Sequence, residues 1–217
     1  MKKLIMIIIG IFLIGGCSTM EINNNKFISS RRPYLEAKIS PDFKYLSHFQ
    51  WEDQILAVNK SRNLRYKNNS YFFIPNSITR GMIPKYVYIK ISEIETYFIE
   101  DLLTDDSYID RDVLKLGWYS FQVGSRMVFP KITEDKQFQK LAEEGYTIPK
   151  CVLQRNALRR VSQNEKTIGI TYGEDATLSG YACEKWKDQA NFTDEQKNYI
   201  SDFNKRALSA FEIIASD

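Results

Sequence analysis

Histidine and cysteine are scarce in this chain of 217 residues, which contains one histidine, His48, and three cysteines. Zinc sites are built largely from these two residue types, so a zinc centre is not expected. The sequence also lacks a P-loop, a GxGxxG stretch and a GxSxG nucleophile motif. We therefore predict no catalytic residue, no metal and no cofactor, and we expect His48 to be structural or simply exposed.

The chain also lacks a large excess of either charge. It has 30 lysine and arginine residues and 27 acidic ones, so its net charge is +3. Nucleic-acid-binding proteins usually carry a strongly basic surface, so no nucleic-acid partner is predicted. The charge is nevertheless uneven, with an acidic segment at 93–112 and a basic one at 150–166. Such segments could orient a partner, but we expect them to neighbour and neutralise each other in the fold.

Two further groups of side chains could bind a ligand. Asp105, Asp106, Asp110 and Asp112 offer oxygen ligands for calcium, but they lack the spacing and central glycine of an EF-hand, so we expect solvated loop acids. Aromatic residues are abundant, with 13 Tyr, 13 Phe and three Trp. Exposed rings would suit stacking on a sugar or a protein partner. Their alternating placement in strands instead predicts core positions for roughly half of them or more.

No apolar run is long enough to cross a membrane comfortably. The longest, at residues 4–16, has 13 residues and would rise about 20 Å as a helix, against about 30 Å of hydrocarbon core. Lys2 and Lys3 precede the run, and Cys17 follows it. This length and these flanks are typical of a signal peptide.

The first 18 residues resemble the signal segment of bacterial lipoprotein precursors. The lipobox-like motif is Ile14-Gly15-Gly16-Cys17, in which Ile14 stands where leucine is more usual. The resemblance implies a signal peptide at residues 1–16, cleavage after Gly16, and acyl chains such as palmitate on Cys17 that hold the protein in a membrane. In such lipoproteins a serine after the cysteine goes with sorting to the outer membrane. Ser18 therefore implies an anchor in that membrane, with the protein facing the periplasm.

Cys151 and Cys183 remain once Cys17 is lipidated, and an even number of cysteines in an exported chain favours a disulfide. Two separate buried thiols are the alternative. A bond would close a loop of about 33 residues, which corresponds to about 3.5–4 kcal/mol in the loop-entropy treatment.

The sequence predicts a lipidated tether at residues 17–32 and a single α+β domain at 33–217. Residues 18–32 are polar and lack an apolar period, and Pro33 marks the expected start of the domain. Alternation is clearest at 117–129, which predicts an antiparallel sheet. Thr193 to Gln196 form a capping-box pattern ahead of an apolar stripe that extends to Ile214. We therefore expect a C-terminal amphipathic helix packed on the sheet.

Three functions are compatible with these features. We favour a lipid-anchored, non-enzymatic interaction or structural module that binds an envelope protein. One alternative is a ligand-binding module for glycan or lipid fragments. Another is an anchored envelope hydrolase that uses scattered carboxylates or His48.

Overall fold

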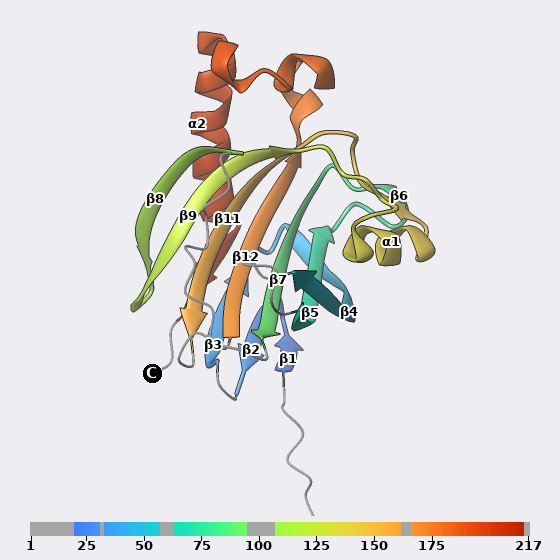
Figure 1. Cartoon of the computed structure of the whole chain (residues 1–217), viewed down its shortest axis with the longest axis vertical. Coiled ribbons are helices and arrows are strands. Elements are labelled where there is room, and N and C mark those ends of the chain that lie inside the picture. The colour runs from blue at the N-terminus through green and yellow to red at the C-terminus, as the bar shows by residue number, and fades with distance from the viewer. Residues whose placement is uncertain (1–19, 31–32, 57–62, 95–106, 162–165, 215–217) are drawn as a thin grey trace, which may run out of the picture.

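A computed structural model describes residues 20–30, 33–56, 63–94, 107–161 and 166–214 (Figure 1). Most of these residues belong to two antiparallel sheets. The large sheet has the strand order β4 (Phe43–Leu56), β5 (Asn63–Pro75), β7 (Lys85–Ile94), β12 (Lys166–Asp175), β11 (Val152–Val161), β9 (Tyr119–Val128), β8 (Tyr108–Leu116). The small sheet has the order β1 (Met20–Asn23), β2 (Lys26–Ser29), β3 (Leu35–Ile39), β13 (Phe211–Ile213).

The remaining elements are short, apart from one helix. The α-helices are α1 (Lys136–Glu143) and α2 (Asp194–Ser209). A parallel pair is formed by β6 (Gly81–Met82) and β10 (Tyr146–Thr147). The 3₁₀ turns are η1 (Ala176–Ser179), η2 (Cys183–Trp186) and η3 (Gln189–Asn191).

The predicted α+β class is wrong, because the described part of the chain is mainly β, with thirteen strands and two α-helices. The segment 152–161, whose pattern is ambiguous between helix and strand, is the interior strand β11, whose backbone pairs with β9 and β12. The apolar stripe after α2 does not continue the helix. Phe211 and Ile213 instead alternate with exposed Glu212 in β13, which pairs with β3.

The predicted tether is also wrong for residues 20–29, which form the hairpin β1–β2 of the small sheet. Asn24 and Asn25 have φ values of 48° and 60°, as the two central residues of a type I′ hairpin turn require, and asparagine tolerates this conformation. Phe27 in β2 is fully buried. The asparagine run is thus a tight turn, and the described part of the fold already includes Met20. Cys17 and the predicted signal peptide lie outside the described residues.

The large sheet has an apolar core on each face, because alternate side chains point to opposite faces. On β5, Phe73 belongs to the core shared with the small sheet and α2, whereas its neighbour Phe72 belongs to the core that includes Phe138 of α1. Figure 1 shows the large sheet in front of α2. The core on one face of the large sheet is thus continuous across both sheets and α2, and the core on the other face is covered by α1.

Helix α2 begins with the predicted capping box. The Thr193 hydroxyl accepts from the Gln196 N–H, and the Gln196 side chain accepts from the Thr193 N–H. Ile200, Phe203 and Ala207 are buried on one side of the helix. The capping pattern and the stripe up to Ala207 thus correctly locate the helix.

The predicted disulfide between Cys151 and Cys183 is confirmed, with Cα atoms 5.6 Å apart. It connects the residue before β11 to η2. No helix in the described ranges is both long and apolar enough to cross a membrane.

Candidate functional site

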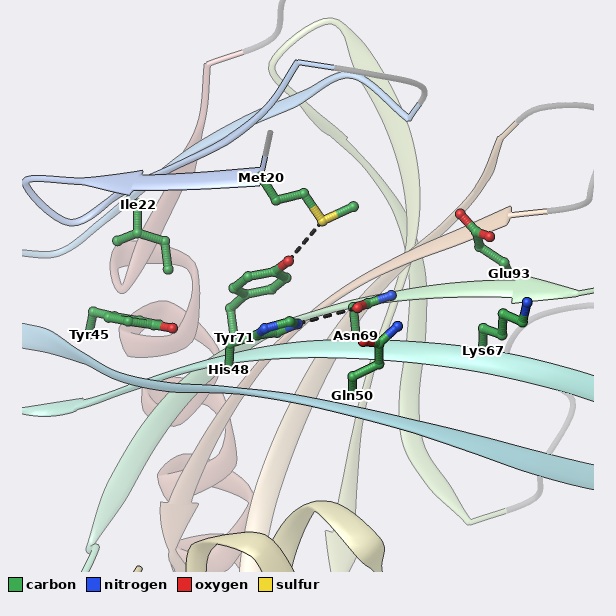
Figure 2. A pocket seen from close by; sticks show the side chains of 9 residues that line it. All are labelled: Met20, Ile22, Tyr45, His48, Gln50, Lys67, Asn69, Tyr71 and Glu93. Carbon is green, nitrogen blue, oxygen red and sulfur yellow. Dashed lines mark hydrogen bonds between the residues drawn. The ribbon is translucent and has the colours of Figure 1, made fainter. Parts of the chain in front are cut away.

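A pocket of about 640 Å³ lies between an edge strand of the small sheet and one face of the large sheet near its edge (Figure 2). Strand β1 is the edge of the small sheet, and β4 is the edge of the large sheet. The pocket is lined by Met20, Ile22, Tyr45, His48, Gln50, Lys67, Asn69, Tyr71 and Glu93.

The pocket has apolar side chains on one side and mainly polar side chains on the other. Met20 and Ile22 are two residues apart on β1, so both point the same way. Figure 2 shows them facing the side chains of β4 and β5 across the pocket.

A β-bulge in β4 brings Tyr45 to the same face as His48 and Gln50. The pairing register shifts between Tyr45 and Ser47, so Tyr45 lies opposite Phe73 while Ser47 lies opposite Phe72. Without the extra residue, positions separated by an odd number would point to opposite faces of the sheet. The bulge therefore adds an aromatic hydroxyl to a surface that otherwise carries imidazole and amide groups.

His48 is held by two neighbours. Its ring stacks on Tyr71, with centroids 4.4 Å apart and planes 11° apart. Its Nε2 lies 3.3 Å from Oδ1 of Asn69 and donates to this oxygen when it carries the proton. The Tyr71 hydroxyl donates to the Met20 sulfur at 2.8 Å, which connects β5 to β1 across the pocket.

The two phenols are neutral at physiological pH. Burial, and to a smaller extent the neighbouring Tyr45, raise the pKa of Tyr71 to about 12. Burial and then the Glu144 carboxylate raise the pKa of Tyr45. Both hydroxyls therefore keep their protons and can donate hydrogen bonds.

Three polar groups of the pocket are available to a ligand. Glu93 is paired with Lys166, with Oε1 and Nζ 2.5 Å apart, although Lys67 lies opposite Glu93 in the sheet. Among the residues that the structure describes, Lys67 has no ion-pair partner. Within the same ranges, the Tyr45 hydroxyl and the Gln50 amide make no hydrogen bond. Gln50 lies opposite Asn69, two residues along β5 from Lys67, so the amide and the ammonium are neighbours that can both donate, whereas Tyr45 lies at the other end of the pocket, beyond His48 and Tyr71 (Figure 2).

The other candidate residues from the sequence do not form a second site of this kind. Asp105 and Asp106 lie outside the described residues, while Asp110 accepts hydrogen bonds from Arg155, Asn204 and the Ser125 N–H. No cluster of His, Cys, Asp and Glu suited to a metal ion occurs in the part of the chain with described structure.

The three tryptophans have different environments. Trp186 is fully buried, whereas Trp118 is 79% exposed at the turn between β8 and β9. The Trp51 ring has the Lys90 ammonium 5.4 Å from its centroid. The aromatic residues therefore divide between core and surface, as their sequence pattern suggests.

Sequence reasoning identified His48 but missed the pocket around it. The pocket depends on Met20 and Ile22, which lie in the segment interpreted as a tether, and on a bulge that has no distinct sequence pattern. Comparison with protein families, with curated proteins and with solved structures finds no match.

Proposed function

We propose that this chain is a lipid-anchored protein of the bacterial envelope that binds a polar ligand in the pocket between β1 and β4 and does not catalyse a reaction. The anchor is supported by the lipobox-like motif that ends at Cys17, and Ser18 favours the outer membrane. The observation that carries the binding function is the pair of neighbouring donors, the Gln50 amide and the Lys67 ammonium, in one pocket.

The chemistry of the pocket favours binding over catalysis. A nucleophilic mechanism needs a side chain activated by an adjacent base. The Tyr71 hydroxyl has a raised pKa and donates to a thioether, so it is poorly suited to attack. Glu93 is neutralised by Lys166, and His48 is oriented by Asn69 and Tyr71. These contacts hold the side chains in place for recognition.

A protein partner at the edge strand β8 is a second candidate function. Val113 is 64% exposed on this strand, and Trp118 is 79% exposed in the turn that follows it. Exposed tryptophans are enriched among the residues that dominate protein interfaces. The envelope protein partner expected from the sequence could bind at this edge.

Native mass spectrometry of the full protein, extracted from its envelope in mild detergent, tests the binding function. We expect wild type to retain a bound small molecule, and the double variant Gln50→Leu, Lys67→Met to lose it. Lys197→Met is the matched control, because Lys197 is a 65% exposed lysine on α2. Equal retention by wild type and the double variant, or no bound mass in either, would reject the proposal.

A further inference from the structure

We infer that the pocket binds the anionic phosphate headgroup of a lipid in the same membrane that holds the anchor. This inference rests on the proposed lipid anchor and specifies the polar ligand. It follows from the position of β1, from the charge in the pocket and from the division of the pocket into apolar and polar sides.

The pocket must lie close to the membrane surface if Cys17 is acylated. Met20 lines the pocket and is only three residues after Cys17. Three residues of chain span at most about 11 Å. The headgroup layer on each side of a bilayer is roughly 5–8 Å thick. The Met20 end of the pocket is therefore within reach of the headgroups. A flexible tether that extended to Pro33 would have allowed the pocket to lie much farther from the membrane.

The charge in the pocket favours an anion. Lys166 pairs with Glu93, which leaves the Lys67 ammonium without an ion pair among the residues of known placement. A lysine binds phosphate as a compact point charge through charge-assisted hydrogen bonds. The Gln50 amide adds a donor beside this ammonium.

The two sides of the pocket match the two parts of a phospholipid headgroup region. Polar side chains of β4 and β5 can donate to phosphate oxygens, while Met20 and Ile22 of β1 present apolar groups opposite them (Figure 2). The glycerol and first methylene groups of a lipid would contact this apolar side. A free phosphate ion has no apolar part that could contact Met20 and Ile22.

Protection of Lys67 from an amine-reactive reagent tests the inference on the full lipidated protein. The protein is reconstituted in vesicles of uncharged galactolipid, with or without phosphatidylglycerol, and acylation of each lysine is measured by mass spectrometry. A third arm adds inorganic phosphate to the galactolipid vesicles. Lys197 on α2 is the internal reference, since α2 begins at the end of the molecule away from β1 in Figure 1.

We expect phosphatidylglycerol to lower the labelling of Lys67 relative to Lys197, and inorganic phosphate to leave it unchanged. We also expect Lys67→Met to retain about fivefold less phosphatidylglycerol after detergent extraction, the factor typical of one lysine at an anionic surface. The variant Gln50→Leu keeps Lys67 and the surface charge, and should lose much of the protection.

Several outcomes would overturn the inference. Equal protection in the Gln50→Leu variant would mean that only proximity to a charged surface matters. Protection by inorganic phosphate alone would identify a soluble ion as the ligand, and protection by galactolipid alone would identify a sugar. A molecule retained in native mass spectrometry without any lipid protection of Lys67 would reject the lipid while leaving the binding function intact.

Discussion

Arg206 on α2 forms a two-point ion pair with Glu174 on β12, with Nη2–Oε1 and Nε–Oε2 distances of 2.7 and 3.1 Å. Glu174 is only 4% exposed, and it also accepts hydrogen bonds from the Tyr172 and Tyr199 hydroxyls. The pair joins the helix to the large sheet at the margin of the shared core. A buried carboxylate with this many donors depends strongly on each of them.

Replacement Arg206→Met should therefore destabilise the protein by about 3 kcal/mol, because it leaves Glu174 buried without its counter-charge. Urea unfolding followed by far-ultraviolet circular dichroism measures the change. Lys205→Met is the control, since Lys205 is 76% exposed and pairs only with Asp202. A loss below about 1 kcal/mol, in the range of surface pairs, would show that the pair is effectively solvated.

The same site predicts acid sensitivity. Burial alone would raise the pKa of Glu174, but hydrogen bonds from Arg206, Tyr199 and Tyr172 outweigh it and hold the pKa below its ordinary value of 4.5. A carboxylate with a lowered pKa contributes stability that is present above the unfolded pKa and is lost as the pH falls through the folded pKa. We expect the free energy of unfolding to fall below pH 4.5, with a shallower decline in Glu174→Gln. Identical pH profiles for the two proteins would contradict this role.

The disulfide should contribute about 3.5–4 kcal/mol, because it constrains a loop of about 33 residues in the unfolded chain. We expect the double variant Cys151→Ala, Cys183→Ala to lose roughly this amount in urea unfolding. Wild type under reducing conditions should show a similar loss without any change of sequence. If the reduced protein is as stable as the oxidised one, the bond does not constrain the unfolded state as proposed.

The turn between β1 and β2 offers a local test of the N-terminal hairpin. Asn24→Val should cost about 1–2 kcal/mol, because a β-branched residue is disfavoured at a φ of 48°. Asn24→Gly should be nearly neutral, since glycine adopts positive φ readily. Thermal unfolding of the two variants compares them directly. Equal stability would mean that the hairpin does not depend on this turn.

Local patterns predicted the elements whose side chains are periodic over many residues. In β9, Phe121, Val123 and Met127 are buried on one face, as alternation predicts. In α2 the capping box and the apolar stripe indicated the helix start. These signals are reliable because many residues repeat the same preference.

Short or composite features were not predictable in this way. Strand β1 has four residues, and its alternation of Met20 and Ile22 is too brief to distinguish from a tether. The small sheet forms because Phe27 is buried against residues distant in sequence, and Phe211 and Ile213 lie on β13 rather than on the helix for a similar reason. The pocket was unpredictable for the same reason, because it forms between β1 and a face of the large sheet that is distant from it in sequence.

The most direct measurement of the lipid-anchored function is the mass of the N-terminal peptide of the protein recovered from its envelope. We predict that this peptide begins at Cys17 and carries a diacylglyceryl group, and that Cys17→Ala abolishes incorporation of a labelled palmitate analogue. An N-terminal peptide that begins elsewhere, or an unmodified Cys17 in a host that lipidates other lipoproteins, would contradict the proposed function.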